Sequence, residues 1–281
     1  MTIDHDVDPV DPVDPATGIP NDIVEAMTDQ MRTVLSIQAS RASACAQAGR
    51  QAAETVTGQE AAELERMRAE YRAERSCWNE DGPVMARTDD SVIRTAGVDV
   101  PIRIHRPTEA ALLPGIVFAH GGGFTLGDLD THDRIQRVLA AESGAAVIGV
   151  DYSLSPEVSY PQALHETAGI VDRIARHGEE FDLDSSRVCL GGDSAGAMLT
   201  MGAALLLRDH PESIGLNPES FSAIKALLLF YGGHGLHDSA SRRLYGGAWD
   251  GMSADDLAAI NTVYFSSPTQ ADEDYVNHLG A

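Results

Sequence analysis

The chain is strongly acidic. Its 281 residues include 20 lysines and arginines against 43 aspartates and glutamates, for a formal net charge of −23 at pH 7. This charge repels phosphate backbones and anionic lipid headgroups, which argues against nucleic-acid and membrane-surface binding. The composition, 43% hydrophobic and 22% charged, is that of a globular protein large enough to fold without metals or disulfides.

The sequence carries no recognisable targeting signal. No apolar run approaches the roughly 20 residues of a membrane span, and the first residues lack the basic segment and apolar core of a secretory signal. The cysteines, Cys45, Cys77 and Cys189, are few, scattered and odd in number, which fits reduced thiols. We therefore expect a cytoplasmic protein; its oligomeric state stays open.

The N-terminal part divides into a tail and a helical region. The tripeptide Val-Asp-Pro occurs three times between residues 7 and 15, and its prolines and like charges predict a disordered acidic tail over residues 1–20. Over residues 21–80, apolar side chains at helical spacing predict two helices. Between them the periodicity of Ser36–Gly58 is weak. The apolar positions are Ile23, Met27, Met31, Val34 and Leu35 in the first helix and Ala61, Leu64, Met67 and Tyr71 in the second.

After Asp90 the pattern changes to strands alternating with helices. Two short β-type runs around Gly97 predict a hairpin. Helices that separate buried apolar runs predict an α/β protein, with a mostly parallel sheet flanked by helices on both faces. The expected strands are Gly115–Ala119, Ala145–Val150, Arg187–Gly191 and Ile224–Tyr231, and the expected helices begin at Thr131, Tyr160 and Ala195.

The run Gly192-Asp193-Ser194-Ala195-Gly196 follows one predicted strand and opens the next predicted helix. Gly-x-Ser-x-Gly in this context is typical of a nucleophile elbow, in which the serine occupies a strained turn. Gly192 and Gly196 would allow the strand and the helix to approach closely. The helix N-terminus also directs free amides toward the serine. We therefore interpret Ser194 as a catalytic nucleophile.

A second motif, His120-Gly121-Gly122-Gly123-Phe124, directly follows the strand Gly115–Ala119. Without side chains, Gly121, Gly122 and Gly123 can present backbone amides to a carbonyl oxygen, and the amide of Ala195 would complete an oxyanion hole. A glycine run is otherwise a flexible loop, and a single histidine is otherwise a packing residue. Both motifs at strand ends favour the catalytic interpretation.

The acidic cluster Asp128, Asp130, His132 and Asp133 allows two interpretations, a metal site or the start of a helix. The second is simpler, with Asp130 as the helix cap and Thr131 in the first turn. No Gly-x-x-x-x-Gly-Lys run is present, so a phosphate-binding P-loop is excluded. We therefore expect neither a metal nor a cofactor.

Taken together, these motifs resemble the hormone-sensitive-lipase-like branch of the α/β-hydrolases, and within it the bacterial acetyl esterases. The resemblance runs from about Glu70 to the end of the chain. It implies hydrolysis of short-chain acyl esters of small molecules without a cofactor, and a helical cap formed by residues 21–80 and about 232–266 over a core within residues 81–281. The matching stretches are His120–Phe124, Gly127–Asp133, Val150–Glu157, Tyr160–Ala163, Gly192–Gly196, Arg242–Leu244 and Trp249–Gly251.

A serine hydrolase of this fold also needs an acid and a histidine, in that order after the serine. The resemblance places them after two further strands, and no matching acid or histidine loop follows Ile224–Tyr231. His234 and His237 fit the cap better, and His278 follows no predicted strand. We therefore assign neither the triad acid nor its histidine to this chain. The last strands are expected to be missing, which would leave Ile224–Tyr231 as an exposed apolar edge.

Three functions follow as hypotheses. The first is a carboxylic ester hydrolase that acts through Ser194 and an acyl-enzyme. The second is a catalytically inactive ligand-binding or interaction protein on the same fold, which the unassigned triad partners favour. The third, a peptidase or amidase, shares the site and is separated from the first only by substrate tests.

Overall fold

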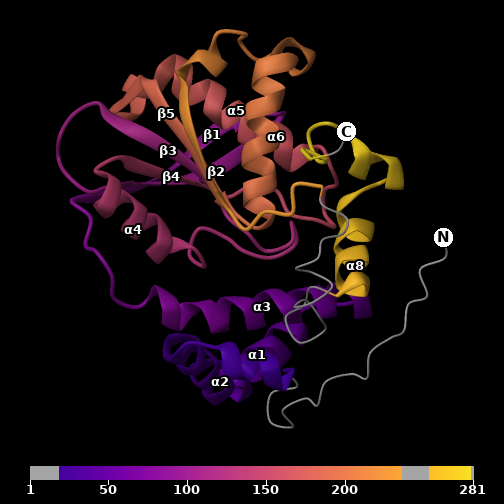
Figure 1. Ribbon diagram of the computed structural model, residues 1–281. Coiled ribbons are helices and arrows are strands. Elements are labelled where there is room, and N and C mark those ends of the chain that lie inside the picture. Colours follow the sequence, from indigo (N-terminus) through magenta and orange to yellow (C-terminus); the bar gives the residue numbers. More distant parts are fainter. Residues whose placement is uncertain (1–18, 236–252, 280–281) are drawn as a thin grey trace, which may run out of the picture. The chain divides into compact units, whose positions relative to one another are not determined.

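A computed structural model describes residues 19–235 and 253–279 (Figure 1). The predicted tail is therefore almost wholly outside the described residues, as are His237 and much of the predicted cap insertion. The chain divides into two compact units, residues 1–43 with 238–259 and residues 44–237 with 260–281. Helix α1 (Asn21–Ala26) belongs to the first unit, whereas α2 (Asp29–Ala53) and α8 (Ala254–Tyr264) each cross a unit boundary.

The described residues of the second unit form a six-stranded sheet in the order β1-β2-β4-β3-β5-β6. Strands β4, β3, β5 and β6 run parallel, whereas the hairpin of β1 and β2 pairs antiparallel with β4. The predicted hairpin, strands and α/β class are confirmed. The strands are β1 (Arg87–Thr95), β2 (Val98–Arg106), β3 (Leu113–Ala119), β4 (Ala146–Val150), β5 (Leu183–Asp193) and β6 (Ile224–Phe230).

Helices cover both faces of this sheet: α5 and α6 lie on one face and α4 on the other (Figure 1). Strands β3 and β4 are buried almost throughout, because both of their faces are covered. The helices of this unit are α3 (Gln59–Asn79), α4 (Asp133–Ser143), α5 (Gln162–His177) and α6 (Ala195–Asp209). Among the described residues, 3₁₀ turns span Gly178–Phe181, Pro211–Ile214, Ser220–Ala223 and Pro268–Asp272.

Strand β6 differs from the buried strand that the sequence predicts. It lies at the end of the described sheet, and its side chains are only partly covered; Leu229 is 36% exposed. An apolar run shows that a segment suits a sheet, but it does not show how many neighbours the strand has. Within the described residues, the expectation of an exposed apolar edge is confirmed. No described helix is long and apolar enough to cross a membrane.

Three local predictions need correction. The first predicted helix is interrupted, since α1 ends at Ala26 and α2 begins at Asp29. Helix α2 continues to Ala53 through the segment of weak periodicity, because alanine and glutamine favour helix even where no apolar face repeats. Helix α4 begins at Asp133, and the carboxylate of Asp130 does not cap it but binds Arg103 at 2.7 Å. The cap comes from α3, since Oδ1 of Asn79 accepts the amide hydrogen of Arg134 at 3.0 Å.

This cap gives a first prediction. Asn79→Ala should lower the free energy of unfolding by about 0.5–2 kcal/mol, the usual cost of a lost helix cap, in urea titrations. Asp130→Ala is the matched control, and because its carboxylate makes only an exposed ion pair it should cost less than about 1 kcal/mol. A larger loss of stability in Asp130→Ala than in Asn79→Ala would restore Asp130 as the cap.

Candidate active site

Ser194 occupies a strained turn between β5, which ends at Asp193, and α6, which begins at Ala195. Its backbone angles, φ +51° and ψ −117°, lie in a region that residues with a side chain seldom adopt. The turn is held in place because the Ser194 amide donates to the carbonyl of Phe230 in β6 at 2.8 Å. Strain of this kind in a supported turn is typical of a functional position.

The flanking glycines are required by close packing. A Cβ atom at Gly196 would overlap the carbonyl groups of Ala119 and His120, and one at Gly192 would overlap the carbonyl of Gly196. The first turn of α6 therefore lies directly against the end of β3. This contact explains the Gly-x-Ser-x-Gly spacing physically and brings the serine beside the loop that follows β3.

That loop turns sharply at its glycines. Gly122 and Gly123 have φ values of +127° and +60°, and a Cβ atom at Gly122 would overlap the carbonyl of Leu126. Within the part of the chain that the structure describes, the amides of Gly122, Gly123 and Ala195 donate to no protein acceptor. Most backbone amides inside a protein are paired, so three unpaired donors beside one serine mark a place where a ligand oxygen can bind.

Asp193 joins the elbow to the glycine loop. Its Oδ1 accepts the amide hydrogen of Gly121 at 2.9 Å and lies 3.6 Å from Nε2 of His132. The hydroxyl of Tyr231 donates to its Oδ2 at 3.4 Å. Burial would raise the pKa of Asp193, but the interactions with His132 and Gly121 outweigh it and hold this pKa below its usual value. The residue is therefore a buried carboxylate at neutral pH.

His120 lies beneath the glycine loop and is 1% exposed. Its Nδ1 donates to the carbonyl of Gly121 at 2.8 Å, and its ring stacks on Tyr152 at 4.4 Å and on His132 at 5.3 Å. The Tyr152 hydroxyl donates to the His120 carbonyl at 2.7 Å. Burial, followed by the charge of His132, lowers the pKa of His120 to about 4. A neutral ring fixed on both faces is suited to support the loop.

The residues proposed for the site therefore lie at the carboxyl ends of β3 and β5 and in the first turn of α6. The prediction for the Gly121 amide is wrong, because this amide donates to Asp193 and is not free for a ligand oxygen. The sequence analysis did not identify the supports His132, Tyr152 and Tyr231. It also did not pair His234 with His278, whose Nδ1 atoms lie 3.0 Å apart. No spacing signal could have paired these two histidines, which are 44 positions apart. Among the described residues, no group of three or more His, Cys, Asp or Glu side chains could hold a metal ion.

The tautomers of the histidine pair follow from its hydrogen bonds. Nε2 of His278 donates to the carbonyl of Tyr275 at 2.8 Å, so its Nδ1 accepts and Nδ1 of His234 donates. Burial lowers the pKa of both rings. A Cβ atom at Gly232 would overlap both the His234 ring and Cβ of Ala197, which places this ring close to the first turn of α6.

Residues 116–281 match a family model described as the α/β hydrolase fold, and the chain belongs to that family. Among its curated relatives are the acetyl esterases of Salmonella paratyphi B and Salmonella schwarzengrund, each 45% identical over 204 residues. The alignment covers 72% of this chain and 60% of theirs, so the chain spans less than two thirds of the length of these relatives.

Solved esterases share the architecture. The Pyrobaculum calidifontis esterase is 31% identical with a TM-score of 0.69, over 78% of this chain and 69% of the other. A thermophilic carboxylesterase from a metagenomic library is 27% identical with a TM-score of 0.70, over 80% of this chain and 74% of the other.

The buried His120 ring gives a second prediction, on pH. Its pKa is about 4 in the folded state and about 6.5 in the unfolded chain, so between these values the unfolded state binds more protons. The contribution of the neutral ring to the free energy of unfolding is complete above pH 6.5 and is lost as the pH falls toward 4. His120→Asn should therefore reduce the pH slope of the unfolding free energy in this window by up to about 1.4 kcal/mol per pH unit.

The control for this measurement is Tyr152→Phe, which removes the hydrogen bond to the His120 carbonyl but no group that titrates near pH 5. It should lower stability by a similar amount at every pH between 4 and 7 in urea titrations. An unchanged slope in His120→Asn would contradict the burial of a neutral ring under the loop.

Proposed function

We propose that the protein is a carboxylic ester hydrolase for short acyl chains, acetyl above all, with Ser194 as its nucleophile. The observation that carries the proposal is the strained Ser194 beside the three unpaired amides of Gly122, Gly123 and Ala195. The acetyl esterases among the relatives support acetyl as the acyl group. The cytoplasmic location, the division into core and cap, and the absence of nucleic-acid and membrane partners stay predictions.

The chemistry would run in two steps through an acyl-enzyme. Oγ of Ser194 attacks the ester carbonyl carbon, and the carbonyl oxygen gains the negative charge that the amides of Gly122, Gly123 and Ala195 stabilise. When the tetrahedral intermediate collapses, the bond to the alcohol oxygen breaks and the alcohol leaves with a proton. Water then attacks the acyl-enzyme in the same way, releasing the carboxylic acid and Ser194. His120 would keep the glycine loop in position throughout.

Both steps need a proton acceptor. We assign no triad acid or histidine among these 281 residues, and loss of the general base costs on the order of 10⁶ in turnover in a Ser-His-Asp hydrolase of an unrelated fold. The second candidate function is a protein that binds ligands on the same fold without turnover. The two candidates differ in one measurable property, hydrolysis that depends on Ser194.

The third prediction is that the purified chain hydrolyses p-nitrophenyl acetate at least about tenfold faster than Ser194→Ala, because only the parent can form the acyl-enzyme. Ser222→Ala, at an exposed serine far along the chain from the elbow, should retain the parent rate. Circular dichroism would confirm that all three proteins fold alike. A hydrolysis rate of His234→Ala as low as that of Ser194→Ala would identify the His234–His278 pair as the base.

Equal rates for the folded parent and for Ser194→Ala would overturn the proposed hydrolase and favour the inactive alternative. If acetanilides are cleaved as readily as acetate esters, the substrate class changes to amides while the role of Ser194 is retained.

A further inference from the structure

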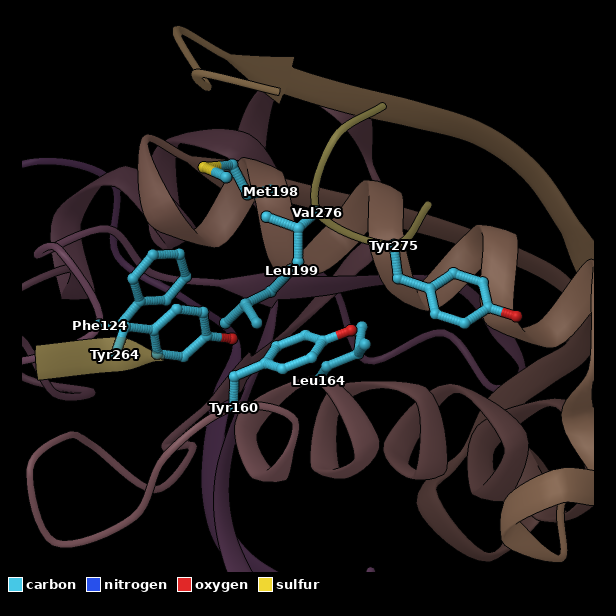
Figure 2. Close-up of a pocket in the computed structure, with 8 residues that line it drawn as sticks. All are labelled: Phe124, Tyr160, Leu164, Met198, Leu199, Tyr264, Tyr275 and Val276. Atoms are coloured by element: carbon cyan, nitrogen blue, oxygen red, sulfur yellow. The ribbon is translucent and has the colours of Figure 1, made fainter. Parts of the chain in front are cut away.

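A small apolar cavity lies beside α5 and α6 (Figure 2). Phe124, which directly follows the glycine run, borders it on one side, and Met198 and Leu199 of α6 border it on another. The space open to a water-sized sphere is about 10 Å³, which is room for one water molecule. An aliphatic chain of several carbons cannot enter without moving the walls.

Two residues of the cavity wall are close to the site along the chain. Phe124 is the residue after Gly123, and Met198 lies one helical turn after Ser194, with its amide donating to the Ser194 carbonyl at 3.3 Å. Both walls therefore begin within one helical turn of the site, and an acyl group carried by Ser194 that follows these walls would enter the cavity.

One wall is a stacked aromatic pair. The rings of Phe124 and Tyr264 lie 3.7 Å apart at an angle of 5°, and Tyr264 is 3% exposed. The pair is fixed from outside: the amide of Tyr160 donates to the Tyr264 carbonyl at 2.9 Å, and the Tyr160 ring meets Tyr264 edge-on at 5.8 Å. Figure 2 shows the two stacked rings beside the α6 side chains.

We propose that the Phe124–Tyr264 stack is the specificity-determining wall that limits the acyl group to about the size of acetyl. This inference rests on the proposed function and assigns its chain-length limit to named residues. In a space of about one water the smallest acyl group displaces the walls least, whereas each added methylene must displace a packed ring further, and one misplaced methylene in an apolar pocket changes kcat/KM by about 10- to 200-fold. Tyr264 is the better residue to change, because Phe124 has φ +62° and belongs to the turn of the glycine loop.

The fourth prediction concerns kcat/KM for p-nitrophenyl acetate, butyrate and hexanoate. The parent should prefer acetate over butyrate by at least about tenfold, and Tyr264→Ala should reduce or reverse this preference, because the lost ring opens the cavity. Tyr264→Leu provides a milder variant should the alanine substitution unfold the protein. The matched control is Leu207→Ala, at a fully buried position of α6 that does not line the cavity; it should destabilise the protein without changing the preference.

A binding series separates this inference from the proposed hydrolysis. Methyl-, butyl- and hexylboronic acids can add to a serine Oγ, and their dissociation constants are measured by calorimetry on the parent, Tyr264→Ala and Ser194→Ala. Methylboronic acid should bind the parent best, and the longer acids should gain at least about tenfold in Tyr264→Ala.

Ester hydrolysis no faster than that of Ser194→Ala, with boronate binding that follows the predicted length rule, would overturn the hydrolase and retain the aromatic wall. An identical length preference in the parent and Tyr264→Ala would overturn the wall, whatever the rates. If the parent and Ser194→Ala bind the boronic acids equally well, or if neither binds them, both the proposed hydrolase and the aromatic wall are overturned.

Discussion

The site depends on one hydrogen bond, from the amide of Gly121 to the carboxylate of Asp193 at 2.9 Å. Parallel pairing of β3 and β5 sets Ala119 opposite Gly192, so the two loops leave the sheet at the same edge. Pairing alone would leave each loop free to turn outward. The carboxylate ties the loop after β3 to the residue before Ser194, and the glycine contacts at Gly192 and Gly196 then leave no space between them.

This arrangement buries polar groups, and their interaction partners offset the free-energy cost of removing these groups from water. Asp193 keeps its charge because His132 and the Gly121 amide face it, whereas His120 stays neutral between Tyr152 and His132. Unpaired buried donors usually destabilise a fold. Of the three unpaired amides, that of Ala195 belongs to a buried residue and those of Gly122 and Gly123 to partly buried ones, so all three are available to a ligand oxygen, which is the basis of the proposed esterase chemistry.

Local patterns were sufficient to predict the hairpin, the alternation of strands and helices, and both loops of the site, because each is encoded by neighbouring residues. Contacts between distant residues were not predictable. Nothing in the sequence indicated that Asn79 would cap α4, that Asp193 would hold Gly121 across 72 positions, or that His234 would meet His278. The exposure of β6 was predicted only from the family resemblance, because the strand's own apolar residues do not encode how many neighbours it has.

The most direct test of the account is a crystal structure of the protein treated with methylboronic acid. We expect boron bonded to Oγ of Ser194, with one of its oxygens about 2.7–3.1 Å from at least two of the amides of Gly122, Gly123 and Ala195. A boronate that is absent from Ser194 at saturating concentration, or whose oxygens contact none of these amides, would contradict the oxyanion site and with it the proposed function.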